Sequence, residues 1–168
     1  MNREKDVKMS YIIYLTLEGD QQGLISSGCS TIDSIGNRYQ SGHEDQIQVL
    51  GLNHTITRDD NVAHHPIQLV KPIDKSSPLL GVSITSNEKL TAKIFFYRTN
   101  SAGKLEVFYE LTLADARVVS VSSSYPHSIN NTESIPYEEI MLKYKSISWS
   151  HKAAGTSGYS IWHDGINE

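Results

Sequence analysis

Hydrophobic and polar side chains alternate along two neighbouring segments, residues 90–99 and 105–113. This period of two predicts a pair of β-strands with one buried face each. The residues between them, 100–103, read NSAG, where Asn and Ser can hydrogen-bond their own backbone and Gly103 can adopt a positive φ. We therefore predict a long β-hairpin over residues 90–121 as the centre of the fold.

The second strand of this hairpin continues past its alternating part into a valine-rich run that ends at Val121. Such a strand is about three times the usual length of ~5 to 6 residues. Its apolar phase slips at residues 114–116, as it does at a β-bulge. A bulged strand bends, and this bend allows a sheet to curl into a barrel or lets the strand pass to a second sheet.

Other strands are expected where β-branched and aromatic residues gather between turn residues. The first of them is apolar on both faces, which indicates that both faces are covered. In the last long one the apolar phase slips once, so we expect a second bend there. The predicted strands are residues 11–17, 24–31 (short), 47–57 (interrupted by Gly51), 67–73 (its end confined to a sheet edge by Pro72), 138–150 and about 159–162. Between them, the polar segments 33–45, 58–66 and 122–136 keep no pattern and are predicted to be loops.

One segment has the signals of a helix start. Ser77 is placed as the N-cap and Pro78 as the first helical residue, and apolar residues follow at helical spacing as far as Asn87. The fold class is therefore all-β: a β-barrel of two antiparallel sheets with one flanking short α-helix over residues 77–87. The 168 residues form one domain over residues 10–164, after a flexible lead over residues 1–9 and before a tail over residues 165–168.

The charge, the cysteine content and the N-terminal sequence exclude several classes of protein from consideration. The net charge is -4, from 15 basic and 19 acidic residues, and the chain lacks a cluster of Lys and Arg, so we expect no nucleic-acid partner. Cys29 is the only cysteine and cannot form an internal disulfide, which fits folding in a reducing cytoplasm. The charged start lacks the features of a signal peptide, and the sequence has no apolar run of 18 residues, so we expect neither general secretion nor membrane insertion.

The residue patterns of common catalytic and cofactor sites are missing from the sequence. The seven histidines include the adjacent pair His64 and His65, whose side chains on an extended backbone point to opposite sides, so we expect no metal site. No Gly-x-Ser-x-Gly elbow and no phosphate-binding glycine motif occurs. Cys29 has no basic neighbour that would activate its thiol and is expected to be a small buried residue. We predict a protein that is not an enzyme and uses no cofactor.

Large apolar side chains also occupy the strand faces opposite the predicted core. We assign Ile12, Tyr14 and Phe108 to a subunit interface, because one barrel offers too few core layers to bury both faces of their strands. Nine tyrosines and two tryptophans leave an alternative open, a carbohydrate-binding β-sandwich.

Several motifs, in this order along the chain, resemble the Hcp family, the tube protein of bacterial type VI secretion systems. The resemblance covers about residues 9–163. It is carried by YIIYL at 11–15, GNRYQ at 36–40 with GHED at 42–45, IDKSSPLL at 73–80, FYR at 96–98, and residues 139–149.

This resemblance implies a hexameric ring that stacks into a tube, and partners that include the contractile sheath, the spike protein VgrG and small effector proteins carried in the lumen. The protein would start in the bacterial cytoplasm and be secreted without a signal peptide. In the family, the segment that matches residues 36–45 leans onto the neighbouring ring. We therefore assign Arg38, His43, Glu44 and Asp45 to ring stacking.

Overall fold

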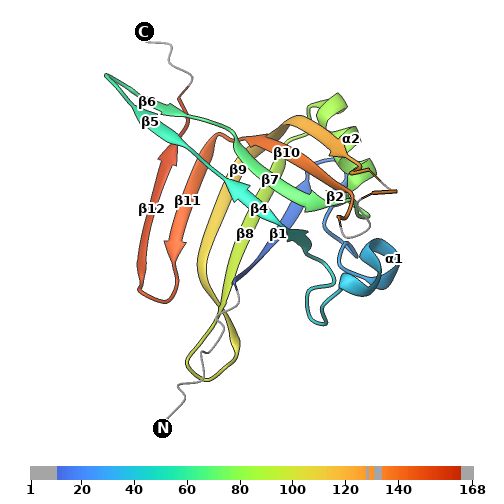
Figure 1. Ribbon diagram of the computed structural model, residues 1–168. Coiled ribbons are helices and arrows are strands. Elements are labelled where there is room, and N and C mark those ends of the chain that lie inside the picture. The colour runs from blue at the N-terminus through green and yellow to red at the C-terminus, as the bar shows by residue number, and fades with distance from the viewer. Residues whose placement is uncertain (1–10, 128, 131–133, 164–168) are drawn as a thin grey trace.

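The computed structural model describes residues 11–127, 129–130 and 134–163 (Figure 1). The predicted lead over residues 1–9 and the tail over residues 165–168 lie outside the described residues. The strands are β1 (Tyr11–Gly19), β2 (Gly23–Leu24), β3 (Ile47–Val49), β4 (Gly51–Asn53), β5 (Ile56–Arg58), β6 (Val62–His64), β7 (Ile67–Pro72), β8 (Leu90–Thr99), β9 (Leu105–Ser124), β10 (Tyr137–Lys143), β11 (Ser146–His151) and β12 (Thr156–Ile161). The helices are α1 (Ile32–Ile35), the 3-10 helix η1 (Gly36–Arg38) and α2 (Ser77–Ser86).

Two antiparallel sheets share the long strand β9. Its first half pairs with β8 and β11, and β8 continues the first sheet to β1, which pairs with β2 and β3. Its second half pairs with β10, which continues the second sheet through β7 to β4. The sheets curve around one core, and α2 covers one side (Figure 1). The predicted fold class, an all-β barrel with a flanking helix, is confirmed.

The central hairpin forms as the sequence predicts. At its turn, the Asn100 side chain accepts hydrogen bonds from the backbone N–H groups of Ala102 and Lys104, and Gly103 has a φ of 79°. The predicted bulge at residues 114–116 is also present, because the pairing with β8 shifts there and Asp115 has a φ of 49°. The bend carries β9 from the first sheet into the second.

The core lies between the sheets and consists of the inward-facing side chains of the strands. Cys29 is fully buried there, as expected from the sequence. The largest fully buried apolar side chains of the cluster are Leu15, Leu17, Ile25, Ile47, Ile67, Leu69, Leu80, Leu90, Ile94 and Leu113.

A buried ion network fastens the start of α2. The ammonium of Lys71 lies 2.9 Å from Asp74 Oδ1 and also pairs with the Glu138 carboxylate, and the hydroxyls of Ser76 and Ser77 donate further hydrogen bonds to these two carboxylates. The helix begins at Ser77 with Ser76 as its N-cap, one residue earlier than the predicted cap. The predicted end at Asn87 agrees with the left-handed cap there.

Three predicted strands differ from the structure. Most of residues 24–31 is a turn and only β2 is a strand, because the N–H groups of Ile25 and Ser26 both bond the Leu17 carbonyl. Residues 47–57 divide at Leu50, where the chain passes from the first sheet to the second. The segment 138–150 likewise divides at Tyr144, which confirms the second bend.

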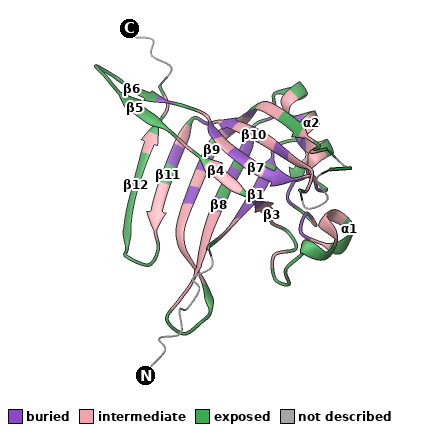
Figure 2. Ribbon diagram, in the orientation of Figure 1, coloured by how far each residue is buried: buried purple, intermediate pink, exposed green. Residues whose placement is uncertain are grey.

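Two of the three predicted loops, residues 33–45 and 58–66, also contain regular structure. Residues 33–45 include most of α1 and all of η1, so the barrel has a second short helical element beside α2. Residues 58–66 close a hairpin, β5–β6, in which Ile56 pairs with His64 and Arg58 with Val62. This hairpin and β12 are almost entirely exposed, whereas the middle of the barrel is buried (Figure 2).

Candidate functional site

The predicted interface residue Tyr14 lies under the loop that was assigned to ring stacking. Its ring stacks on the His43 imidazole, with centroids 4.1 Å apart and planes at 4°, and the Tyr97 ring meets it edge-on. The Tyr14 hydroxyl donates a hydrogen bond of 2.9 Å to Gln40 Oε1. Only 2% of Tyr14 is exposed, and burial raises its pKa, so the phenol stays neutral. We call Tyr14, Gln40, His43 and Tyr97 the aromatic clamp.

Further hydrogen bonds hold the same loop to its own subunit. His43 Nδ1 lies 2.5 Å from Gln46 Oε1. The Asp45 carboxylate accepts the Gly28 N–H at 3.0 Å, and the Glu44 carbonyl accepts the Ser30 N–H at 3.1 Å. The loop is therefore fixed in one position on the barrel rather than extended into solvent.

The four residues assigned to ring stacking share this loop but differ in surroundings. Arg38 and Glu44 are exposed, and the hydrogen bond from the Gly42 N–H lowers the pKa of the Glu44 carboxyl, so this side chain stays charged. His43 and Asp45 have partners within the subunit. The charges of Arg38 and Glu44 are thus exposed, while His43 and Asp45 position the loop that carries them.

The three residues assigned to the subunit interface do not share one uncovered face. We expected that Tyr14 could not be buried within its own subunit, and this expectation is wrong. The loop that carries His43 buries the Tyr14 ring. Ile12 and Phe108 are half-buried. Phe108 is the extra residue of a bulge between two register positions of β8 and β9, and the Arg98 guanidinium lies 4.8 Å from its ring centroid.

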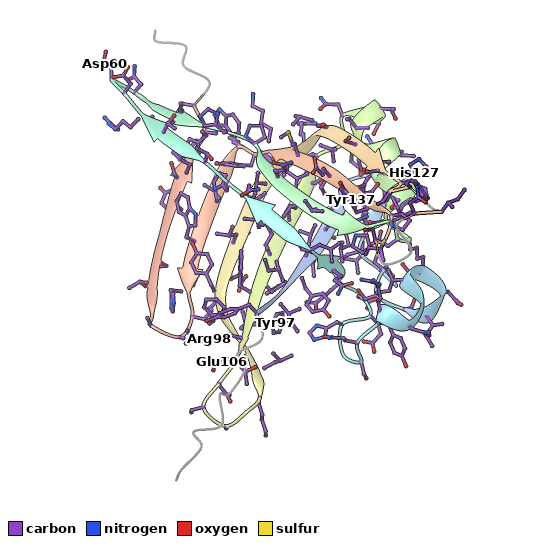
Figure 3. All side chains as sticks on the ribbon, viewed as in Figure 1. Asp60, Tyr97, Arg98, Glu106, His127 and Tyr137 are labelled. Carbon is purple, nitrogen blue, oxygen red and sulfur yellow. The ribbon has the colours of Figure 1, made fainter. Side chains whose placement is uncertain are left out.

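Arg98 and Phe108 belong to a surface at the turn end of β8 and β9. Arg98 also pairs with Glu106 at 3.3 Å, close to Tyr97 (Figure 3). The Phe108 ring meets Tyr11 and His151 edge-on, each at 6.0 Å. This mixture of half-buried aromatic rings and paired charges resembles the composition of protein interfaces.

A second cluster, which the sequence did not predict, joins five residues from four segments. The Tyr144 hydroxyl lies 2.7 Å from His64 Nδ1 and 2.9 Å from His54 Nε2, and His64 Nε2 lies 3.0 Å from Ser160 Oγ. The Trp162 ring stacks on His64 at 5.8 Å. We call these five residues the histidine latch, because they fasten the base of the β5–β6 hairpin to the barrel.

Burial sets the protonation state of the latch. Desolvation, followed by the charges of neighbouring histidines, lowers the pKa of both His54 and His64. Desolvation raises the pKa of Tyr144 to about 12. At neutral pH both imidazoles are therefore uncharged, and the Tyr144 hydroxyl can donate to one ring and accept from the other.

A pocket of about 420 Å³ opens beside the latch, at the junction of β9, β10 and β11. Three of its side chains are cationic, Arg117, Lys143 and Lys145, and its one carboxylate, Asp115, already pairs with Lys89 at 3.1 Å. The remaining lining residues are Asn87, Val119, Tyr144 and Trp162. We call this cavity the basic pocket.

Metal and thiol chemistry find little support in the described part of the chain. Within residues 11–127, 129–130 and 134–163, no group of three or more His, Cys, Asp or Glu side chains is arranged to hold a metal ion. Burial raises the pKa of the Cys29 thiol to about 12, which leaves very little thiolate at neutral pH. None of the helices described is long and apolar enough to cross a membrane.

Comparison with known proteins gives consistent matches over nearly the whole chain. The family model described as "Type VI secretion system effector, Hcp" matches residues 14–151. The "Major exported protein" of Pseudomonas aeruginosa is 39% identical over 166 residues, which cover 91% of this chain and 96% of that protein. The uncharacterized protein YhhZ of Escherichia coli is 42% identical over 149 residues, 88% of this chain but only 37% of that longer protein.

Solved structures agree with the sequence matches. A crystal structure of an Hcp protein superimposes with a TM-score of 0.87 at 34% identity and covers 93% of this chain and all of that one. The secreted protein Hcp3 from Pseudomonas aeruginosa gives a TM-score of 0.83 at 38% identity, over 92% of this chain and all of that one. The carbohydrate-binding alternative finds no support in these matches. The chain belongs to the Hcp family of type VI secretion proteins.

Proposed function

We propose that six copies of this chain close into a ring, and that the rings stack into the inner tube of a type VI secretion system. The observation that supports this proposal is the match to exported Hcp proteins over nearly the full chain, with 39% identity over 91% of its length. The barrel, with α2 on one side, matches a solved Hcp structure at a TM-score of 0.87. The ring is a structural and carrier protein with no catalytic role.

The tube has partners at each of its surfaces. The contractile sheath surrounds the tube, the spike protein VgrG caps it, and small effector proteins bind in its lumen. The protein is made in the bacterial cytoplasm and leaves through the type VI machinery.

Two surfaces carry the assembly. Ile12 and Phe108, with the side chains around Arg98, lie on the surface that closes the ring. The loop bearing Arg38 and Glu44 stacks one ring on the next, and the aromatic clamp holds this loop in place. Exposed ion pairs contribute only ~0 to 1 kcal/mol each, but sixfold repetition adds these contributions.

Size-exclusion chromatography with light scattering tests the ring directly. We expect a mass close to six times 18.8 kDa at micromolar concentration. A monomer at every concentration would contradict the proposal. Export is tested by comparing culture supernatants of a strain with an intact type VI system and a matched strain that lacks the sheath. We expect the protein only in the first supernatant.

A further inference from the structure

The basic pocket lies where β9 passes from the first sheet to the second. Lys143, at the end of β10, pairs with Arg117 of β9, and Ser146, at the start of β11, pairs with Ala114. Neither pairing includes the residues in between, where Asp115 has a φ of 49°. The pocket of about 420 Å³ opens between these two pairings, and its volume lies within the range of ~300 to 1,000 Å³ that is usual for small-molecule sites.

Two cations of the pocket stand directly opposite each other on neighbouring strands. Arg117 and Lys143 are register partners of an antiparallel pair, so their side chains share one face of the sheet, where like charges repel. The exposed Lys145 adds a third positive charge. The one carboxylate among the described residues of the lining, Asp115, pairs with Lys89, which lies outside the lining. These residues give the pocket an excess of positive charge on a protein whose net charge is -4.

Contacts within the subunit hold two of these cations in position. The Arg117 guanidinium donates a hydrogen bond to the carbonyl of Asn87, the C-cap of α2. A guanidinium has five N–H donors, so Arg117 keeps others for a ligand. The Lys143 ammonium lies 5.0 Å from the Trp162 ring centroid. Side chains that are already positioned lose little entropy when an anion binds between them.

The rest of the lining offers apolar surface. Val119 is 45% exposed, and the Tyr144 and Trp162 rings lie on the side of the histidine latch. Trp162 is fixed, because its ring stacks on His64 and its backbone N–H donates to the Lys145 carbonyl at 2.7 Å. A ligand that carries an anionic group and an organic group matches this combination of cations and apolar side chains.

We propose that the basic pocket binds a small organic phosphate. Its phosphate groups lie between Arg117, Lys143 and Lys145. Its organic part packs on Val119 and Trp162. A phosphate group carries a charge of about -1.5 to -2 at pH 7, so three cations favour it over a single carboxylate.

Side chains, rather than the glycine-rich loop that the sequence lacks, hold the anion at this site. All of the lining residues belong to one chain, so the site is complete within a single subunit. The inference therefore goes beyond the proposed ring and does not depend on it.

Calorimetric titration of the full-length protein with ADP tests the site, because ADP joins a diphosphate to an organic ring. We expect saturable binding, and an affinity for pyrophosphate that is at least ~3-fold weaker because pyrophosphate lacks the organic part. Adenosine, which lacks the phosphates, should not bind at the same concentrations. Absence of saturable ADP binding up to about 1 mM, or equal affinities for ADP and pyrophosphate, would overturn the proposal.

Single substitutions separate this site from a general effect of charge. Lys145→Gln removes an exposed cation of the lining and should weaken ADP binding by ~10-fold or more. Lys145→Arg keeps the charge and should bind ADP within ~3-fold of wild type. Lys93→Gln is the matched control, because it removes the same charge from an exposed position on β8 outside the lining, and it should bind as wild type does. Equal affinities of the two Gln variants would overturn the proposal.

Tryptophan fluorescence locates the ligand. The chain has two tryptophans, so Trp162 is the remaining one in the variant Trp149→Phe. Its emission should change saturably with ADP and should not change with sodium chloride at the same ionic strength. An equal change with sodium chloride would show an effect of ionic strength only and would overturn the proposal. Failure to bind ADP leaves the ring proposal standing, since the mass of the assembly tests that proposal separately.

Discussion

Residues 33–45 and 58–66 are both polar, and neither shows a periodic pattern of hydrophobic residues. In the structure, however, the first packs on the barrel and the second projects from it. The first segment folds onto the barrel, where His43 stacks on Tyr14 and Asp45 accepts the Gly28 N–H. The second forms a hairpin whose tip at Asp60 projects away from the barrel (Figure 3). The difference shows that polarity alone does not tell whether a segment packs on its own subunit or projects from it.

The cause lies in what each segment meets. The first finds an aromatic surface of Tyr14 and Tyr97, and stacking of aromatic rings adds ~0.5 to 1.5 kcal/mol beyond the area that it buries. The second has its own strand ladder and is fastened to the barrel at its base, through His64. The loop is fixed because it has partners on the barrel at Gln40, His43 and Asp45. The β5–β6 hairpin is held at its base and projects as an arm.

The largest effect is expected for Tyr14→Asp, which breaks the aromatic clamp. Loss of a buried aromatic ring costs ~3 to 5 kcal/mol, and an unpaired buried carboxylate adds to this. We expect a sharp drop in the free energy of unfolding, measured by urea denaturation, rather than a folded monomer. Tyr14→Phe is the control, which loses only the hydrogen bond to Gln40 and should cost ~1 kcal/mol. An Asp variant as stable as wild type would mean that the clamp does not hold the loop.

A smaller effect is expected for His43→Ala, which removes the stack but leaves Tyr14 in place. We expect a loss of ~1 to 2 kcal/mol in the free energy of unfolding and faster hydrogen exchange in residues 36–46. The exposed His127→Ala serves as the matched control and should change neither quantity. Unchanged exchange in the His43 variant would show that Asp45 and the backbone bonds alone fix the loop.

Acidification should destabilise the histidine latch at the base of the β5–β6 hairpin rather than the loop that carries His43. The pKa values of His54 and His64 lie below the ordinary value in the folded protein, so the unfolded chain binds protons more readily. The stability that these neutral imidazoles contribute is therefore present above about pH 6.5 and is lost as the pH falls below that value.

The measurement is the urea midpoint at about pH 7.5 and about pH 5.5. We expect a lower midpoint in acid and a smaller difference in the variant His54→Gln with His64→Gln. If the double variant shows the full wild-type difference, other groups cause the pH dependence.

The smallest effect on stability is expected when Arg38, Glu44 and Asp45 are replaced together by Ala. Exposed charges contribute only ~0 to 1 kcal/mol per pair, so the hexamer should persist in light scattering while tubes disappear from electron micrographs. Added salt should weaken wild-type stacking in the same direction. The triple Ala variant of Glu18, Asp20 and Lys93 carries the same change in charge and should form normal tubes. Normal tubes in the loop variant would show that this loop does not stack rings.

Local patterns in the sequence were sufficient for the framework of the barrel. Alternation along β8 and the first part of β9, the glycine at the turn and the phase slip near Ala114 predicted the bent central hairpin, and Ser77 with Pro78 placed α2 to within one residue. These features are determined by neighbouring residues, because strand period, turn φ and helix capping depend on positions a few residues apart. Family resemblance then placed the chain among the Hcp proteins.

The candidate sites depended on contacts between distant residues, which only the tertiary structure decided. His54 and His64 meet Tyr144 across 90 and 80 positions of sequence, and Gln40 reaches Tyr14 across 26. No local period encodes such pairings, because they follow from how the two sheets curve and where each loop returns. The sequence by itself thus determined the central hairpin with its bend, the helix α2 and the family. The fold decided that Tyr14 is covered within its own subunit and that the segment around Asp60 projects as an arm.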